Sequence, residues 1–275
     1  MILNARMYSP TPEIAALWNA LLEQVAAACA APVRLFDYPP PQPLGPLWAR
    51  ADKAAVFMCG LPFGLADPAP VAVAVPVPKL PGGAGRPVYW SDLVVRADSA
   101  FHHLADTFGG RVALTTLESQ SGCVAMLDHL TEGDVPSPPY AEVIGPTVTF
   151  LANLRAVIDG QADVAPLDSY GFALLQRHHP ELTAQVRVIA RTRPMPMPLL
   201  VGSSAVPGLA EVFLDLHRRP ACWALLDALL LDRFMAPAAE DYAVLARRRE
   251  VAFAHWRGRP LSRTANPDFR VPAGQ

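Results

Sequence analysis

The stretch of sequence that decides the fold is Arg111-Val-Ala-Leu-Thr-Thr-Leu-Glu-Ser-Gln-Ser-Gly-Cys-Val-Ala-Met-Leu-Asp-His-Leu130. It begins with an apolar stretch, residues 112–114, that has the character of a β-strand. It ends with Val124, Leu127 and Leu130 at the three-residue steps of an amphipathic helix. A strand that passes through a polar turn into a helix belongs to a βαβ unit, so the stretch indicates an α/β protein.

The polar turn of this stretch contains Ser119, Gln120 and Ser121, followed by Gly122. Small polar residues cap a helix and leave its first backbone N–H groups pointing outward. Together with two hydroxyls and the positive end of the helix dipole, these N–H groups would form a cradle for an anion. The same residues also suit an ordinary helix N-cap, and both interpretations stand at this stage.

Strands and helices alternate on both sides of the turn. Predicted strands outside the stretch lie at 2–8, 33–36, 54–58, 71–75, 88–95, 141–144, 164–167, 186–189 and 199–201. Predicted helices begin at Thr11-Pro12-Glu13, span 98–108, 150–159 and 170–178, and form three segments after 201 that end near Trp256. The alternation from 93 to 194 predicts an inserted lobe of parallel βα units. Residues 1–92 and 195–275 would form the other lobe, with crossing strands near 90–95 and 190–200.

Composition limits the function classes. Apolar residues make up 52% of the 275 residues and charged residues 17%, which is typical of a well-packed globular protein. The net charge is −2 and no basic stripe accompanies Arg247-Arg248-Arg249, so we expect no nucleic-acid partner. No apolar run reaches the length of a membrane span. Met1 to Tyr8 lacks the features of a secretory signal. We therefore expect a cytoplasmic protein, or a periplasmic one if a signal peptide has been removed.

Metal and cofactor sites are not expected. The cysteines (Cys29, Cys59, Cys123 and Cys222) lie far apart in apolar contexts, which favours buried thiols. The adjacent pairs His102-His103 and His178-His179 point about 100° apart on a helix, so neither pair chelates a metal alone. No Gly-x-Ser-x-Gly elbow, phosphate-binding P-loop or dinucleotide fingerprint stands out.

Several segments together resemble the substrate-binding proteins of phosphate, phosphite and phosphonate ABC transporters. They are Cys59-Gly-Leu-Pro-Phe63, Tyr89-Trp-Ser-Asp-Leu-Val-Val-Arg96, Glu118-Ser-Gln-Ser-Gly122, Leu154 to Asp168, and Ala173 to Pro180. The resemblance covers roughly residues 1–205, and its specific parts are the Ser-Gln-Ser-Gly turn and Gly160-Gln-Ala-Asp-Val-Ala-Pro-Leu-Asp168. It implies a two-lobed α/β type II periplasmic-binding-protein fold with the ligand cleft between the lobes.

The resemblance also implies a set of ligand-binding residues. The serine-rich turn (Ser119, Gln120, Ser121) would hold the oxyanion. Tyr89 would line the cleft, with Ser91 in the same segment, and Gly60, Leu61 and Phe63 would face it from the other lobe. Family members commonly carry Gly-Ser-His where this chain has Val148-Thr149-Phe150. Thr149 keeps a hydroxyl, but Phe150 replaces a histidine that could pair with a phosphoryl group, so a less charged or partly apolar ligand becomes plausible.

Two more residues follow predicted strands and carry two interpretations each. Asp168 would accept hydrogen bonds from a ligand amine or hydroxyl, or it would cap the next helix with Ser169. Tyr8 would stack on or hydrogen-bond a ligand, or it would be a buried tyrosine with a satisfied hydroxyl.

The function expected from these observations is reversible capture of a small, oxyanion-bearing ligand, with no chemistry and no cofactor, by two lobes that close by hinge motion. The partners would be the ligand and the membrane component of an ABC transporter. One alternative is a cytoplasmic lyase of menaquinone biosynthesis on the same fold, for which Asp168 is the one candidate catalytic carboxylate. A ligand-sensing module is a second alternative, although 275 residues leave no room for a DNA-binding domain.

Overall fold

The computed structural model describes residues 1–272, which form two compact units. Unit 1 comprises Met1–Tyr89 and Met195–Ala243. Unit 2 comprises Trp90–Pro194 and residues 244–272. Each unit is therefore assembled from segments that are distant in the sequence. No helix among the described residues combines the length and the apolar character that a membrane span requires.

Unit 1 is built on a six-stranded mixed sheet with the order β13-β4-β12-β3-β1-β2. β1 (Ile2–Asn4) runs parallel to its two neighbours, β2 (Arg34–Leu35) and β3 (Lys53–Met58). The other half is antiparallel: β12 (Leu199–Gly202) pairs with β3 and β4 (Val71–Pro78), and β13 (Leu231–Met235) pairs with β4. A small ribbon joins β5 (Val88–Tyr89) to β11 (Met195–Pro196).

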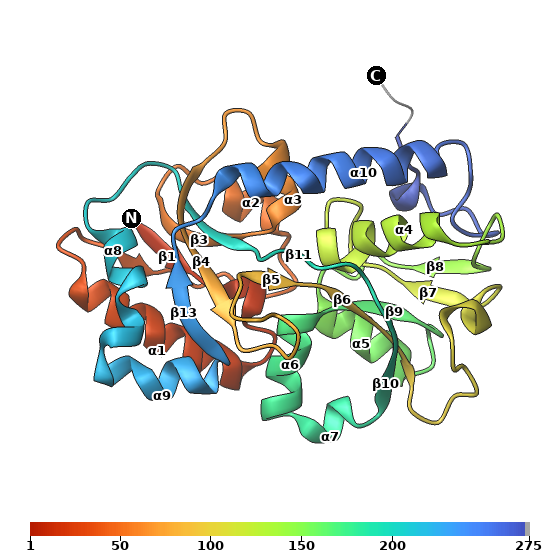
Figure 1. Ribbon diagram of the computed structural model, residues 1–275, viewed down its shortest axis with the longest axis horizontal. Helices are drawn as coiled ribbons and strands as arrows, with labels where there is room; N and C mark the ends of the chain where they lie inside the picture. Colours follow the sequence, from red (N-terminus) through yellow and green to blue (C-terminus); the bar gives the residue numbers. More distant parts are fainter. Residues whose placement is uncertain (273–275) are drawn as a thin grey trace. The chain divides into compact units, whose positions relative to one another are not determined.

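Helices of unit 1 pack on this sheet and on one another (Figure 1). They are α1 (Pro12–Ala28), α2 (Leu44–Trp48), α3 (Gly60–Leu65), α8 (Leu209–Leu214) and α9 (Pro220–Ala228). α1 begins as the sequence predicts, because the Thr11 hydroxyl accepts the N–H of Ile14 and proline occupies the first turn. Its apolar face buries Trp18 edge-on against Phe57 of β3, with ring centroids 5.1 Å apart.

Unit 2 contains two small sheets. β6 (Ser91–Arg96) lies between β10 (Val186–Arg191) and β9 (Ala165–Asp168) and is antiparallel to both. β7 (Arg111–Ala113) and β8 (Glu142–Ile144) form a parallel pair, and Val112 bridges to Val164 beside β9. The parallel arrangement predicted for this region is therefore right for β7 and β8 and wrong for β6.

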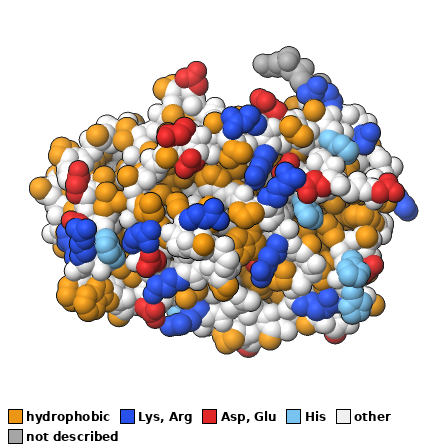
Figure 2. All heavy atoms as spheres, viewed as in Figure 1, with side chains coloured by type: hydrophobic (Ala, Val, Ile, Leu, Met, Phe, Trp, Pro, Cys, Tyr) orange, Lys and Arg blue, Asp and Glu red, His pale blue; other side chains and the backbone are white. Residues whose placement is uncertain are grey.

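The helices of unit 2 follow the strands. A π-helical turn (Gln120–Val124) leads into α4 (Ala125–His129), and α5 (Phe150–Ile158), α6 (Ser169–His178) and α7 (Pro180–Thr183) come later in the chain. α10 (Ala243–Trp256) enters the unit near the C-terminus. Lys and Arg side chains are interspersed with acidic and apolar ones over the face in Figure 2.

The predicted helix at 98–108 is wrong. Only a short 3-10 helix, Leu104–Thr107, forms there. The carboxylate of Asp98 pairs with Arg96, and the carboxylate of Asp106 accepts the backbone N–H groups of His102 and His103. Side-chain oxygens therefore hold this segment in turns that compete with a helix.

Two other predictions for unit 1 need correction. The first strand ends at Asn4 instead of Tyr8, because the Asn4 side chain accepts the N–H of Arg6 at 2.9 Å and a 3-10 helix, Arg6–Tyr8, follows. The apolar run after α9 is a strand, β13, where the sequence suggested helix. It starts directly after Leu230, whose φ of 52° ends the preceding helical path.

The C-terminal segment is divided differently from the predicted lobes, since residues 244–272 belong to unit 2. The Trp256 indole donates to the Leu127 carbonyl at 3.1 Å, and Arg263 and Thr264 donate their N–H groups to Tyr140 and Ala141. These bonds hold the tail to unit 2. Residues 273–275 of the predicted lobe lie outside the described residues.

Candidate ligand-binding site

The serine-rich turn of unit 2 starts with a capped helix terminus. Ser119 is extended (φ −79°, ψ 121°) and its hydroxyl accepts the N–H of Gly122 at 3.1 Å. The N–H of Val124 reaches back to the Ser119 carbonyl at 3.0 Å, which gives this turn its wide π-helical form. Ser119 is thus an N-cap, and the N–H groups of Gln120 and Ser121 belong to the first turn, which has no intrahelical carbonyls to bind.

Gly122 allows the turn to lie against the end of β7. A Cβ at this position would lie 2.1 Å from the Thr115 hydroxyl oxygen, a distance that no side chain tolerates. The Thr115 N–H donates to the Gly122 carbonyl at 3.1 Å. The glycine is therefore required by close approach, and Thr115 is a positioning residue that the sequence analysis missed.

Three of the predicted site residues meet at the end of the unit 2 sheet. Ser91 lies directly opposite Asp168 in the β6–β9 register, and its hydroxyl donates to the Ser121 carbonyl at 2.8 Å. The Ser121 hydroxyl in turn donates to the Asp168 Oδ2 at 3.4 Å. Ser91 is fully buried, so its hydroxyl holds the turn from the interior of unit 2.

Asp168 is the last residue of β9 and the cap of α6. Its Oδ1 accepts the N–H groups of Tyr170 at 3.0 Å and Gly171 at 2.9 Å. Its Oδ2 faces Ser121, and 6% of the residue is exposed. Burial, together with the nearby Asp168 charge, raises the pKa of Tyr170 well above its ordinary value, so this tyrosine stays neutral.

Gln120 brings a buried amide to the same turn. The residue is 1% exposed, and its Oε1 has no hydrogen-bond partner among residues 1–272. Because a buried polar atom without a partner costs free energy, this amide is suited to contact a bound ligand.

Thr149 and Phe150 form the start of α5. The Thr149 hydroxyl accepts the N–H of Ala152 at 3.1 Å and caps the helix. The Phe150 ring lies against the first turn of α6, since a Cβ on Gly171 would fall 2.5 Å from the Phe150 Cζ. Phe150 therefore covers the backbone that the Asp168 carboxylate caps.

Two hydroxyls beside this cluster make contacts that the sequence did not predict, although Ser169 was expected to help cap α6. The Thr192 hydroxyl accepts the N–H of Ser91 at 2.9 Å, and the Ser169 hydroxyl accepts the N–H of Trp90 at 3.1 Å. Both bonds are long-range and local periodicity carries no signal for them. They anchor the start of β6 and so hold Ser91 under the turn.

The remaining predicted site residues are buried in unit 1. Tyr8 is fully buried, packs edge-on against Phe57 with ring centroids 5.2 Å apart, and directs its hydroxyl to the Met197 sulfur at 4.0 Å. Gly60, Leu61 and Phe63 lie in α3, where Phe63 packs on Tyr242. Tyr89 is fully buried at the end of β5. These residues form core contacts of unit 1, and their ligand-facing role stays a prediction.

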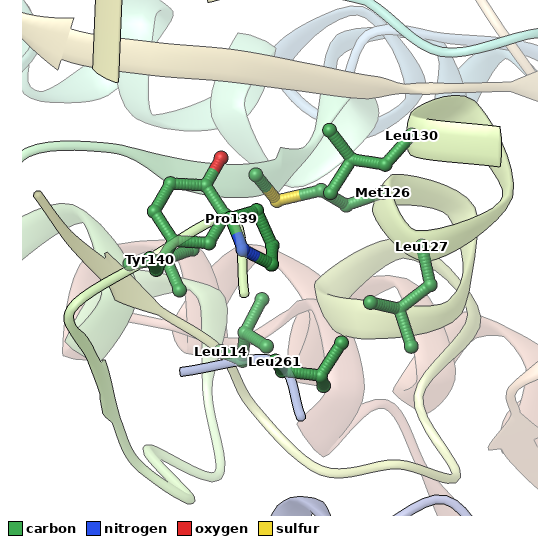
Figure 3. A pocket seen from close by; sticks show the side chains of 8 residues that line it. Leu114, Met126, Leu127, Leu130, Pro139, Tyr140 and Leu261 are labelled. Atoms are coloured by element: carbon green, nitrogen blue, oxygen red, sulfur yellow. The ribbon is translucent and has the colours of Figure 1, made fainter. Parts of the chain in front are cut away.

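Unit 2 also holds a small cavity with a volume of about 10 Å³ (Figure 3). Only apolar side chains and Tyr140 surround it, from β7, α4, the segment before β8 and the C-terminal tail: Val112, Leu114, Met126, Leu127, Leu130, Pro139, Tyr140 and Leu261. A volume of this size holds at most about one water molecule, so it is a packing defect and not a ligand site. The described residues contain no cluster of His, Cys, Asp and Glu suited to a metal ion.

Comparison with known protein families gives one match over most of the chain. The family described as the periplasmic substrate-binding protein of the phosphonate ABC transporter matches residues 9–242. A comparison with curated protein sequences finds no match.

Several solved structures have the same fold. The binding protein component of an ABC phosphonate transporter from Pseudomonas aeruginosa aligns with a TM-score of 0.71 at 19% identity, covering 91% of this chain and 85% of that chain. PhnD1 from Prochlorococcus marinus, in complex with methylphosphonate, aligns with a TM-score of 0.74 at 15% identity, covering 91% and 97%. The periplasmic aliphatic sulphonate binding protein SsuA from Escherichia coli aligns with a TM-score of 0.53 at 15% identity, covering 100% of this chain and 94% of that chain. The fold is that of the two-lobed type II periplasmic binding proteins.

Proposed function

The chain belongs to the family of periplasmic substrate-binding proteins of phosphonate ABC transporters, and from this membership we propose that it captures a small organic oxyanion at the serine-rich turn of unit 2. The family consists of binding proteins, so the solute-binding function is the one that the comparison supports, and the lyase alternative gains nothing from it.

The observation that carries the proposal is the meeting of hydrogen-bond donors and a carboxylate at one point. The N–H groups of the first turn suit an oxyanion. The Ser121 hydroxyl suits one when its single proton turns from the Asp168 Oδ2 to the ligand. The Asp168 Oδ2, 3.4 Å from that hydroxyl, accepts hydrogen bonds and repels a bare anion. A ligand that satisfies both groups has an oxyanion at one end and an N–H or O–H donor close to it.

Phe150 narrows the ligand class further. Its ring provides an apolar surface at the start of α6, where a histidine would provide a hydrogen-bond donor and, when protonated, a positive charge. Losing a hydrogen bond to a charged group costs about 1.5–3 kcal/mol. We therefore propose an amino- or hydroxyalkyl phosphonate, or a related sulfonate, whose alkyl carbon packs on Phe150.

Membership in this family implies a small-molecule ligand and a transporter in the membrane. We propose that the loaded protein delivers its ligand to the membrane components of an ABC transporter. The family is periplasmic, and we propose the same location for this protein.

A ligand screen followed by recovery of the ligand tests the proposed function. Purified protein is heated with methylphosphonate, aminoalkyl and hydroxyalkyl phosphonates, alkyl sulfonates, inorganic phosphate and small carboxylates. A specific ligand raises the melting temperature, since about 100-fold excess over Kd adds about 2.7 kcal/mol of stability. Mass spectrometry then recovers the ligand unchanged. Preference for a carboxylate over every phosphonate and sulfonate, or conversion that disappears in Asp168→Asn, would overturn the proposal.

A further inference from the structure

The guanidinium of Arg6 in unit 1 is a buried cation without an anionic partner. The residue is 7% exposed and makes no salt bridge with any carboxylate among residues 1–272. Its Nη2 donates to the main-chain carbonyl of Gln42, and its Nε is buried with no hydrogen-bond partner in the described part of the chain. The Tyr38 ring, 5.9 Å from the guanidinium carbon, adds a weak cation–π contact.

This arrangement is costly for a structural arginine. Burial lowers the pKa of Arg6 from its ordinary value, against a smaller opposing effect of Tyr38, and the guanidinium nevertheless remains charged. A buried charge is normally compensated by an opposite charge and by hydrogen bonds at all of its donors. The Gln42 carbonyl satisfies one donor and supplies no negative charge.

A second arginine of unit 1, Arg50, shows what the Nε–Nη2 edge of a guanidinium binds when both nitrogens donate hydrogen bonds. Arg50 presents its Nε and Nη2 to the two carboxylate oxygens of Asp52, with both distances 2.8 Å. In Arg6 the equivalent Nε donates no hydrogen bond within the described part of the chain, and the equivalent Nη2 donates to one carbonyl oxygen. Arg6 therefore presents half of a bidentate oxyanion contact, with the Gln42 carbonyl in the place of one oxygen.

Arg6 also stands where ligand sites occur in parallel sheets. It begins the 3-10 helix directly beyond β1, whose two neighbours run parallel to it, so three carboxyl ends meet here. The loop of residues 36–43 covers the guanidinium. Asn4 donates to the Phe36 carbonyl at 2.7 Å, which attaches the start of the loop to β1. Tyr38 donates to the Pro43 carbonyl at 2.9 Å, a bond within the loop itself.

We propose that Arg6 is an oxyanion-binding residue of unit 1, which takes a carboxylate or phosphoryl group on its Nε–Nη2 edge when the 36–43 loop releases the Gln42 carbonyl. The ligand is a small anion, and Tyr38 packs beside it. All the observations behind this proposal come from unit 1, so its test does not depend on the proposed role of the serine-rich turn of unit 2.

NMR of the intact protein tests this site without depending on a variant. Protein labelled with ¹⁵N-arginine is titrated with inorganic phosphate, and separately with acetate, against sodium chloride of equal ionic strength. The Nε–Hε signal of Arg6, assigned by its loss in Arg6→Lys, shifts and saturates with at least one of the two anions. A shift with phosphate alone identifies a phosphoryl group, and a shift with acetate identifies a carboxylate. An Arg6 signal that follows chloride equally, or does not move with either anion, overturns the proposal.

Variants give a second measurement. Arg6→Met removes the charge but keeps the apolar stem, and we expect its anion-specific rise in melting temperature to need about tenfold more anion or to vanish. Arg50→Met is the matched control, because that arginine also stacks on a ring of this loop, Phe36 at 4.3 Å, but is already paired with Asp52. In the NMR titration, we expect the anion-induced shift of the Arg6 signal to persist in Ser121→Ala, because that variant changes unit 2 and not Arg6. Equal loss in Arg50→Met contradicts a specific role for Arg6.

Discussion

The Ser121 hydroxyl lies 3.4 Å from the Asp168 Oδ2, which joins the serine-rich turn to the cap of α6. One residue supplies a donor and the other an acceptor, so the pair can recognise a ligand that carries both kinds of group. The two residues are 47 positions apart in the sequence. The β6–β9 pairing sets Ser91 opposite Asp168, and the Ser91 hydroxyl holds the carbonyl of Ser121 beside it.

Removing the hydroxyls of the turn should weaken binding and leave the fold intact. For a ligand found in the screen, Ser119→Ala with Ser121→Ala should cost about 1–3 kcal/mol of binding free energy, measured by calorimetry. Ser119→Ala alone should also lower the unfolding free energy by about 0.5–2 kcal/mol, because it removes the Gly122 cap. Thr131→Ala removes a hydroxyl that donates to the Asp128 carbonyl and serves as the control. Unchanged affinity in the double variant would show that these hydroxyls cap the helix and do not contact the ligand.

Asp168→Asn should separate two ligand classes. The amide keeps an oxygen for the N–H groups of Tyr170 and Gly171 and loses the negative charge. Affinity for methylphosphonate should stay equal or rise, since repulsion of the oxyanion is removed. Affinity for an aminoalkyl phosphonate should fall by about 1.5–3 kcal/mol, the value of a hydrogen bond between charged groups. Parallel titrations of both ligands measure the difference, and an equal effect on the two would exclude Asp168 from contact with the amine.

Phe150→His should raise the affinity for phosphonates. A histidine at the start of α5 donates to a phosphoryl oxygen, and its ordinary pKa of about 6.5 makes the gain larger at pH 6 than at pH 8. The gain should reach about 1.5–3 kcal/mol at the lower pH. Phe150→Leu, which removes the ring from Gly171 without adding a donor, is the control. A gain of the same size in both variants would show that relief of packing is responsible.

Gly122→Ala should destabilise unit 2. The new methyl group would overlap Thr115, and overpacking of this kind costs about 1–3 kcal/mol in urea unfolding. Thr115→Ala in the same protein should recover part of the loss. Gly45→Ala is the matched control, because a Cβ at that helical glycine meets no atom within 4 Å. Similar unfolding free energies for the two alanine variants would contradict the close approach at Gly122.

The stability of the protein should depend on pH through Asp92. Burial raises the pKa of this carboxyl above 3.8, against the opposing effects of the Arg191 charge and of hydrogen bonds from Trp90 and Arg191. A raised folded-state pKa gives a contribution that is fully present below the ordinary value and lost as the pH rises through the raised value. The unfolding free energy of the wild type minus that of Asp92→Asn should therefore be higher at pH 4 than at pH 7. The opposite trend in urea titrations would show that the ion pair with Arg191 outweighs burial.

The sequence predicts most of the elements that surround the site because those elements have local signals. The Thr11 cap with Pro12 and the periodic apolar face fix α1, and a short polar turn after an apolar strand marks the turn at Ser119. Local signals failed in the segment 98–108, where the side chains of Asp98 and Asp106 stabilise turns that compete with the predicted helix. They also failed at β13, because its apolar run continues the pattern of α9. The helical path ends at Leu230, whose backbone adopts a positive φ of 52°.

Within the candidate site, the sequence pointed to several residues that the structure brings together, but not to the contact that each of them makes. Ser91, Ser121 and Asp168 are connected by hydrogen bonds across three segments, and only the strand register shows that Ser91 supports the turn from a buried position. Arg6 carried no signal at all. Its burial results from the loop of residues 36–43, and no periodicity describes how a loop lies over a side chain.

The strand order of unit 1 also has a consequence for synthesis on the ribosome. β12 lies between β3 and β4, and β13 lies beyond β4, so the first 89 residues lack the strand that joins the two halves of their sheet. That strand emerges only after residues 90–194 have been made, and the edge strand emerges later still. The emerging N-terminal segment therefore carries unpaired strand edges through more than a third of translation. Unpaired edges of this kind can pair with other chains, so this segment of the nascent chain is one that a chaperone would protect until β12 emerges.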